Sequence, residues 1–238
     1  MRLAPNLHRI GDDIVAAYLV VAPDGVLVVD AGLPGHWKLL TAELAGLGLS
    51  VDDVRGVVLT HGDSDHLGFA ERLRRDHGVA VHVHAADAAR ARGEERVRMS
   101  RQSWRPGPTA GFLANTVGRG GLRTTYVEEV VEVHDGDVLD LPGAPHVVGL
   151  PGHSPGSIAI HVPSVSAVFV GDALTTRHVL TGRRGPQPAP FTDDPEGALA
   201  SLDRLSVLDA TWVLPGHGAP WDGGAAAAAR EVRLAAAR

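Results

Sequence analysis

Cysteine is absent from the 238-residue sequence, and Lys38 is the only lysine among its 22 basic residues. Without cysteine the chain forms no disulfide, presents no thiolate nucleophile and offers no Cys sulfur to a metal. Long apolar runs are also missing, since the longest, such as residues 14–22, are too short to span a bilayer. The first residues lack the basic and apolar segments of an export signal, so we predict a cytoplasmic protein with no membrane partner.

The balance of charge argues against a broad class of partners. The chain has 22 basic and 28 acidic residues, for a net charge of -6. No general polyanion-binding surface is implied, and we predict no nucleic-acid partner. The contents of 44% hydrophobic and 21% charged residues are typical of a folded globular protein and exclude a disordered chain or a coiled coil. The 29 glycines and 16 prolines indicate many turns and disfavour long helical bundles.

Short apolar strands alternate with helices along both halves of the chain. Pro23-Asp24-Gly25 separates two β-branched runs and predicts a hairpin. The alternation predicts an α/β sandwich with helices outside central sheets. We expect a single domain over residues 1–238, with a cap insertion at about 87–125 that carries eight arginines. The expected helices span 36–47, 67–77, 195–208 and 225–237, and the expected strands span 14–22, 26–30, 54–60, 79–84 and 211–214, with others between 126 and 173.

Residues able to bind a metal follow four of the apolar strands. These residues are His61, His153, Asp172 and His217, and each has Gly or Pro close by. Strand ends next to Gly or Pro are where α/β folds build their sites. We therefore expect these four side chains to belong to one functional site.

The densest cluster is His61-Gly62-Asp63-Ser64-Asp65-His66, which places four metal-binding side chains within six residues. In an extended segment His61 and Asp63 lie on one side, and the turn into the next helix lets Asp65 and His66 point back toward the same cavity. Imidazole and carboxylate groups suit Zn, Fe or Mn. The alternative is a polar turn in which Asp63 or Ser64 caps the next helix. Two His and two Asp, with three further ligands at strand ends, favour the metal site.

Taken together, these segments resemble the metallo-β-lactamase superfamily. Residues 60–68 are similar to its H-x-H-x-D-H signature, residues 29–32 to its early strand-end motif, and residues 152–157, 170–172 and 215–218 to its remaining motifs in order. The resemblance implies a four-layer αβ/βα sandwich with the site along one edge of its two sheets. By position it implies two metal ions, the first held by His61, Asp63 and His153 and the second by Asp65, His66 and His217, with Asp172 bridging them.

One position departs from the usual pattern, because Asp63 stands where a histidine is most common. A carboxylate remains a competent ligand, and three carboxylates with one bridging hydroxide would balance two divalent cations. The harder oxygen shifts preference from zinc toward iron or manganese, and in this the site resembles the diiron flavoproteins of the superfamily, which place Glu there. We expect two divalent metal ions, with zinc in first place and iron or manganese as alternatives.

The implied activity is that of a metal-dependent hydrolase. Two metals would share a water, lower its pKa and supply a hydroxide for attack on a carbonyl or phosphoryl centre, with Asp65 assisting proton transfer as the catalytic residue. The best-known dizinc β-lactamases carry a cysteine where Asp172 stands, so this chain is more similar to the lactonases, thioesterases, phosphodiesterases and diiron oxidoreductases of the superfamily. We predict a small-molecule substrate, namely a small ester, lactone or thioester, and allow for a homodimer.

Three alternative functions stay open. The first is an iron-dependent oxidoreductase, flavodiiron-like or persulfide-dioxygenase-like, on the same fold. The second is a phosphodiesterase, and the third is a metal scaffold without catalysis. Iron at stoichiometric level and oxygen consumption would distinguish the oxidoreductase from the hydrolase.

A serine hydrolase is the competing interpretation of one motif. The segment around Ser154 matches G-x-S-x-G, and chain order permits a triad with Asp172 and His217. Pro155, however, has no backbone N–H to donate to an oxyanion. Residues 158–162 alternate as in a strand, where the serine-hydrolase elbow requires a helix. The metal interpretation also accounts for more of the polar residues.

Several other residues are weighed against packing roles. His82 and His84 share a strand face, and His178 follows the Asp172 strand toward the expected pocket. The aromatic residues expected either to pack or to contact substrate are Trp104, Phe112 and Tyr126. The arginines of residues 90–123, with Arg177, Arg183 and Arg184, predict either a basic lid for an anionic substrate or a solvated face.

Overall fold

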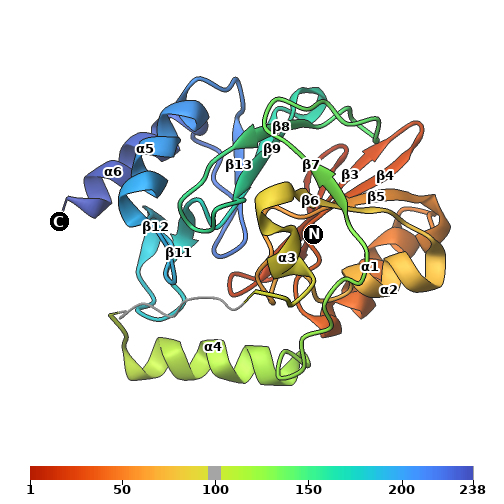
Figure 1. Cartoon of the computed structure of the whole chain (residues 1–238), viewed down its shortest axis with the longest axis horizontal. Helices are drawn as coiled ribbons and strands as arrows, with labels where there is room; N and C mark the ends of the chain where they lie inside the picture. The colour runs from red at the N-terminus through yellow and green to blue at the C-terminus, as the bar shows by residue number, and fades with distance from the viewer. Residues whose placement is uncertain (96–102, 238) are drawn as a thin grey trace.

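Two sheets packed face to face, with helices on both outer faces, form the frame of the protein (Figure 1). The computed structural model describes residues 1–95 and 103–237. Within them, no helix has both the length and the apolar character that crossing a membrane requires. The layered arrangement follows from the alternation of apolar strands and amphipathic helices along the chain.

The N-terminal half forms a seven-stranded sheet whose strand order follows the sequence. Its first four strands pair antiparallel, and the last four pair parallel through helical crossovers. The hairpin predicted at Pro23-Asp24-Gly25 is confirmed, with Ala22 paired to Gly25. The strands are β1 (Arg2–Ala4), β2 (Leu7–Gly11), β3 (Ala16–Ala22), β4 (Gly25–Val29), β5 (Val54–Val58), β6 (Val81–His84) and β7 (Val131–Val133).

The C-terminal half forms a four-stranded sheet with the order β13-β10-β9-β8. β8, β9 and β10 pair antiparallel, and β13 lies parallel to β10. A separate two-stranded ribbon, β11-β12, follows β10. The strands are β8 (His146–Gly149), β9 (Ile158–Val162), β10 (Ala167–Gly171), β11 (Thr175–Arg177), β12 (Arg184–Gln187) and β13 (Trp212–Pro215).

The helices lie at or near the positions that the sequence predicts, with one shorter than expected. The α-helices are α1 (Trp37–Gly46), α2 (Ala70–His77), α3 (Ala88–Ala91), α4 (Pro106–Gly118), α5 (Pro195–Ser206) and α6 (Ala225–Ala236). Short 3-10 turns occur at Pro34–His36, Val51–Asp53, Ala85–Asp87 and Pro163–Val165. The helix expected from residue 67 begins at Ala70, because the backbone before it binds another loop instead: Gly68 N–H donates to Gly32 O at 2.8 Å.

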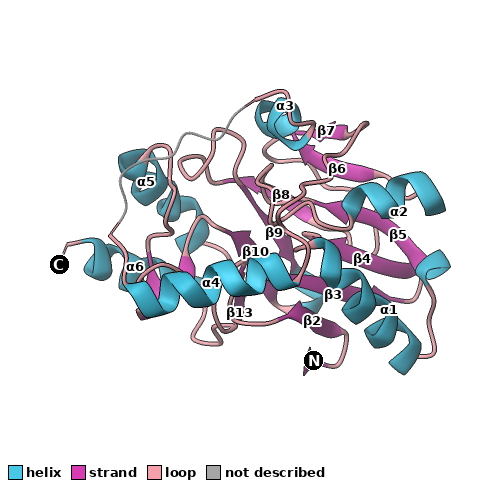
Figure 2. Ribbon diagram, turned by 90° about the horizontal axis from the view of Figure 1, so that it is seen from below, coloured by secondary structure: helices cyan, strands magenta, loops and turns pink. Residues whose placement is uncertain are grey.

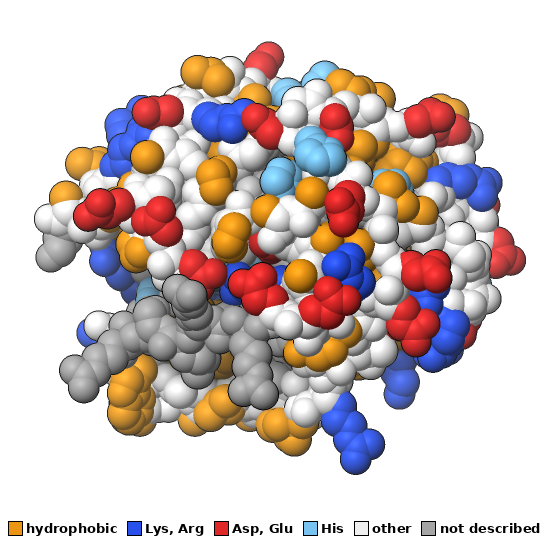
Figure 3. Space-filling model, viewed as in Figure 1, with side chains coloured by type: hydrophobic (Ala, Val, Ile, Leu, Met, Phe, Trp, Pro, Cys, Tyr) orange, Lys and Arg blue, Asp and Glu red, His pale blue; other side chains and the backbone are white. Residues whose placement is uncertain are grey.

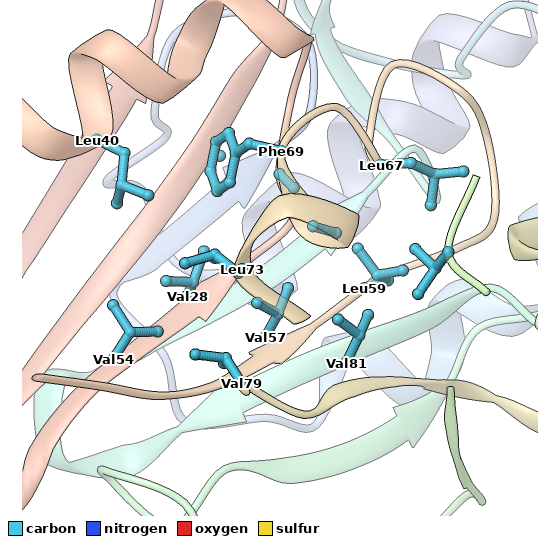
Figure 4. Packing of buried hydrophobic residues seen from close by; sticks show 14 of the residues in the cluster. Val28, Leu40, Val54, Val57, Leu59, Leu67, Phe69, Leu73, Val79 and Val81 are labelled. Atoms are coloured by element: carbon cyan, nitrogen blue, oxygen red, sulfur yellow. The ribbon is translucent and has the colours of Figure 1, made fainter. Parts of the chain in front are cut away.

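Three buried clusters hold the layers together. Between the sheets, Tyr18 of β3 packs on Phe169 of β10 with ring centroids 5.4 Å apart. On the outer face of the seven-stranded sheet, α1 and α2 bury Leu40 and Leu73 against the strands (Figure 4). On the outer face of the second sheet, α5 and α6 cover the strands with a third cluster that includes Leu202. The order of helix, sheet, sheet and helix confirms the predicted four-layer αβ/βα sandwich.

The segment predicted as a cap insertion, about 87–125, contains α3 and α4. Figure 2 shows α4 running across the sandwich on the side from which that view is taken. Residues 96–102, which include three of the eight arginines, lie outside the described residues. The single-domain organisation and the capping role of this segment stay predictions.

Candidate metal centre

The loops that leave four strands converge at one edge of the sandwich and bring all seven predicted ligands together. These loops follow β5, β8, β10 and β13. β10 and β13 are parallel, so their carboxyl ends reach the same edge. The potential donor atoms form three overlapping groups, within 4.8 Å of one another in each group: His61, Asp63 and His153; Asp65, His66 and His217; and His61, His66 and Asp172.

The first two groups contain the same residues that the sequence analysis assigns to the two expected metal positions. In the first, Asp63 Oδ2 lies 3.3 Å from His153 Nε2 and 3.7 Å from His61 Nε2. In the second, Asp65 Oδ2 lies 3.4 Å from His217 Nε2. Separations of this size between potential ligand atoms are those expected where the atoms share a cation.

Asp172 lies between these two groups. Its Oδ1 is 3.6 Å from His66 Nε2, and its Oδ2 is 3.1 Å from His217 Nε2 and 3.8 Å from His153 Nε2. The carboxylate therefore faces ligands of both groups, as the predicted bridging role requires. Gly216 permits this approach, because a Cβ there would overlap His66 Cε1 and lie 2.8 Å from Asp172 Oδ1.

Each of the four histidines has a partner at Nδ1, which leaves Nε2 for the site. Nδ1 of His66 lies 2.9 Å from Asp30 Oδ2, and Nδ1 of His217 contacts the carbonyl oxygen of Ile14. The two remaining Nδ1 atoms face threonine hydroxyls, at 3.1 Å for the pair His61–Thr60 and 3.3 Å for the pair His153–Thr192. Such partners fix the orientation of metal-binding imidazoles.

Several buried polar atoms of the site have no hydrogen-bond partner, and this indicates whether the residues fit a metal ion. His61 Nε2, His66 Nε2 and Asp172 Oδ1 are buried and find no hydrogen-bond partner among the described residues. An unsatisfied buried polar group costs about 1–3 kcal/mol, so three in one place need an explanation. A cation bound by these atoms supplies one, and the donor set of imidazole and carboxylate suits a divalent transition metal.

The charges of the site are strongly coupled. Burial opposes protonation of His66, but the carboxylates of Asp30 and Asp172 outweigh it and raise the pKa of His66 to about 10. Burial also opposes protonation of His217, but the carboxylate of Asp172 outweighs it and raises the pKa of His217 to about 9. Burial lowers the pKa of His61 well below its usual value. Because these carboxylates favour the protonated imidazoles, metal binding at His66 and His217 would be coupled to the release of protons.

Asp87, which the sequence analysis does not single out, ties two of the ligand loops together. Its fully buried carboxylate accepts hydrogen bonds from Gly62 N at 2.8 Å, Gly156 N at 2.7 Å and Ser154 Oγ at 2.7 Å. Ser154 Oγ also lies 2.8 Å from Ser157 Oγ. The Ser154 hydroxyl is thus engaged in fixing loops, and β9 follows it as the alternation predicts, so the serine-hydrolase elbow is not supported.

A cleft of about 290 Å³ opens beside the candidate ligands. Its apolar wall consists of Leu33, Phe112, Val179 and Phe191. Phe112 of α4 lies with its ring centroid 6.5 Å from that of His217, so the segment at 87–125 contributes an aromatic side chain to the wall of the cleft. The other two aromatic candidates do not line this cleft: Trp104 is largely exposed and Tyr126 faces a different hollow.

The remaining histidine candidates lie elsewhere. His82 Nδ1 is 3.1 Å from Val57 O on the neighbouring strand β5, and His84 Nδ1 accepts from Ala86 N, so both contact backbone groups outside the site. His178 lines a neighbouring cavity of about 580 Å³ between the β11-β12 ribbon and the last two helices.

The arginine lid is not supported by the described residues. Among residues 1–95 and 103–237, none of the cleft-lining side chains is Arg, and Arg183 faces the neighbouring cavity instead. Arg119 pairs with Asp12 at 2.7 Å. Arg90 is not on a solvated face at all: it is buried and contacts Asp63. The sequence offers no signal for this contact, because Arg90 begins a polar run rich in arginine and belongs to no ligand motif.

Comparison with known proteins agrees with this geometry. The family model described as the metallo-beta-lactamase superfamily matches residues 10–217, and the chain belongs to this superfamily. Among curated proteins it is similar to the probable metallo-hydrolase YflN of Bacillus subtilis (strain 168), with 28% identity over 233 residues, which is 92% of this chain and 86% of that protein.

Two solved structures are similar over most of the chain. The metallo-beta-lactamase family protein TTHA1429 from Thermus thermophilus has a TM-score of 0.71 and 26% identity, over 99% of this chain and 80% of that one. TTHA1623, solved in a di-iron-bound form, has a TM-score of 0.63 and 29% identity, over 92% of this chain and 96% of that one. Both confirm the fold predicted from the motifs.

Proposed function

We propose that this protein is a metal-dependent hydrolase that uses two divalent ions to cleave a small ester, lactone or thioester. The observation that carries the proposal is the convergence of seven donor side chains in three overlapping groups with Asp172 between them. His61, Asp63 and His153 would hold one ion and Asp65, His66 and His217 the other. Two such ions, when bound, would supply the Lewis acidity that generates hydroxide from water near neutral pH.

The side chains of the site would then divide the remaining work. Asp172 would keep both halves of the site together, because it faces His66 with one oxygen and His217 with the other. Asp65 is the most exposed of the three candidate carboxylate ligands, with 21% of its side chain accessible, so it is placed to pass a proton to or from the substrate.

The lining of the cleft favours a carbonyl substrate over a phosphodiester. Its apolar wall of Leu33, Phe112, Val179 and Phe191 suits an acyl group. The described residues that line it include no Lys or Arg to neutralise a phosphate. Acidic and basic side chains are interspersed on the face that Figure 3 shows. The net charge of the chain is -6, and we propose a small-molecule substrate without a nucleic-acid partner.

An iron-dependent oxidoreductase is the second candidate. It is favoured by one observation, the di-iron-bound form of TTHA1623, which is 29% identical to this chain. The oxygen ligand Asp63 is also compatible with iron. Stoichiometric iron in the purified protein together with oxygen consumption would select this function over hydrolysis.

The hydrolase is tested by stripping the metal with a chelator and adding back Zn²⁺, Mn²⁺ or Fe²⁺ separately. Each form is assayed on p-nitrophenyl acetate, a γ-lactone, an acyl thioester and bis-p-nitrophenyl phosphate. We expect carbonyl substrates to be hydrolysed only after metal is restored. Cleavage of the phosphodiester alone, or hydrolysis that survives chelation, would contradict the proposal.

Two variants accompany the assay. Asp172→Ala should abolish hydrolysis and lower the metal content, because the shared carboxylate is lost. Asp209→Ala, at an exposed position, serves as the matched control and should change neither. Full activity and metal content in Asp172→Ala would refute the assigned role of Asp172.

A further inference from the structure

Arg90 of α3 is a buried cation beside the candidate metal centre. Only 3% of its side chain is exposed. Its Nε lies 2.5 Å from Asp63 Oδ1, and its Nη1 donates to Asp193 Oδ2 at 2.8 Å. A guanidinium so deeply buried is retained only where carboxylates compensate its charge.

The approach of Arg90 to the ligand loop depends on Gly62. A Cβ at Gly62 would lie 2.8 Å from Ala91 N and 2.9 Å from Arg90 Cβ. The absence of a side chain between His61 and Asp63 thus allows α3 to pack directly on the ligand loop. The contact between Arg90 and Asp63 is a consequence of this packing.

The two oxygens of Asp63 have different surroundings. Oδ1 faces the guanidinium of Arg90 and forms an ion pair with its Nε, without the geometry of a hydrogen bond. Oδ2 faces the site, 3.3 Å from His153 Nε2 and 3.7 Å from His61 Nε2. Asp63 therefore offers one oxygen to a cation, in the same way that an imidazole offers one nitrogen.

Arg90 also reaches the loop that orients His153. Asp193, its second partner, donates its backbone N–H to His153 O at 3.0 Å. The preceding Thr192 places its hydroxyl 3.3 Å from His153 Nδ1. One guanidinium thus connects two of the three members of the first ligand group.

From this geometry we infer that Arg90 is a positioning residue for Asp63. It leaves Asp63 with one oxygen free to bind a metal, and it compensates the negative charge of the carboxylate. Asp63 then acts as a histidine would, as an effectively neutral ligand with one donor atom. The inference rests on the proposed metal centre and deepens it. The inference means that the residue types at positions 63 and 90 are coupled. A histidine at 63 is compatible with an uncharged residue at 90, whereas an aspartate at 63 requires the arginine.

The coupling is tested by a double-substitution cycle with Asp63→His, Arg90→Met and the two combined. Each protein is stripped of metal and titrated with Zn²⁺. Bound equivalents are counted by elemental analysis, and affinity is measured by competition with a chromophoric chelator. Arg92→Met is the matched control, since Arg92 is nearby in the chain, more exposed, and paired with Glu94 outside the site.

In Asp63→His alone, the buried cation of Arg90 faces an uncharged ligand and a Zn²⁺ ion. We expect one of the two zinc equivalents to be weakened by about tenfold or more. The combined variant should restore that equivalent to within about threefold of the wild-type affinity. Asp63→His with Arg90→Lys, which keeps a cation, should stay weak. Arg92→Met should bind zinc as the wild type does.

Several results would overturn the inference. These are wild-type zinc affinity in Asp63→His, additive losses in the combined variant, or failure of the combined variant to fold. If Asp63→His does not fold but the combined variant does, the rescue of folding supports the coupling. If the wild-type protein binds no metal, the proposed function fails. Two zinc ions bound equally well in all variants would overturn only the role of Arg90.

Discussion

The orientation of His66 by Asp30 gives the sharpest single-residue test of the centre. The buried carboxylate of Asp30 follows β4 and lies 2.9 Å from His66 Nδ1. It also accepts from Thr60 N at 2.8 Å and from Thr60 Oγ1 at 2.9 Å. We consider Asp30→Asn, which keeps the shape of the side chain. Asp30 has a φ of 59°, and Asn tolerates that left-handed conformation, so backbone strain does not confound the result.

The expected loss of zinc affinity in Asp30→Asn follows from the hydrogen bonds that Asp30 makes. Oδ1 of Asp30 accepts from Thr60 N–H, and Oδ2 lies against His66 Nδ1. An asparagine has only one acceptor oxygen, so in either orientation its NH₂ group faces a buried donor. A buried donor left without a partner costs about 1–3 kcal/mol. The loss of such a partner typically lowers metal affinity about 10–100-fold, which agrees with that range.

The assay is a zinc competition titration of metal-free protein. Asp30→Asn should bind its more weakly held zinc about 10–100-fold less tightly than the wild type. Asp209→Asn, which changes an exposed carboxylate in the same way, should leave the affinity unchanged. Equal zinc affinities in the Asp30 variant and the wild type, with both folded, would refute the reasoning.

Three further predictions concern stability and the competing interpretation. Asp87→Asn should lower the free energy of unfolding by about 1–3 kcal/mol in a urea titration, because its NH₂ group would replace one of the two acceptor oxygens and face at least one buried donor, and an unchanged midpoint would contradict this. Ser154→Ala should lose only about 1 kcal/mol of stability and should retain hydrolysis that a chelator abolishes. If a serine-directed phosphonate labels the wild-type protein and abolishes its activity, the serine hydrolase is favoured instead. Burial lowers the pKa of His36 from 6.5 to about 4, so the unfolded chain takes up a proton in this interval that the folded protein does not. The free energy of unfolding should therefore fall as pH drops from 6.5 toward 4, by up to about 1.4 kcal/mol per pH unit. In melting experiments at several pH values, His36→Phe should flatten this dependence. The control His146→Gln, at an exposed position, should not.

The architecture and the set of converging side chains could be predicted from the sequence because both depend on local patterns. Apolar runs that end in His or Asp beside Gly or Pro define the strands and the polar residues at their ends. Parallel pairing then brings such strand ends to one edge, as it does for Asp172 and His217. The helix expected from residue 67 was too long because its first turn binds the loop at Gly32, a contact between segments far apart in the chain.

The residues that sequence reasoning missed act through tertiary packing. Asp87 and Arg90 belong to no ligand motif, and their roles arise because α3 packs on Gly62. Arginine in a polar run is normally solvated, and composition gives no indication of which one is buried. Thr192 likewise meets His153 only when the chain between β12 and α5 folds back over the site.

Anomalous diffraction from crystals of metal-reconstituted protein tests the central claim most directly. We predict two anomalous peaks at the edge of the sandwich, one within the group of His61, Asp63 and His153 and one within the group of Asp65, His66 and His217. Peaks only outside these groups, or none at this edge in protein loaded with metal, would contradict the account.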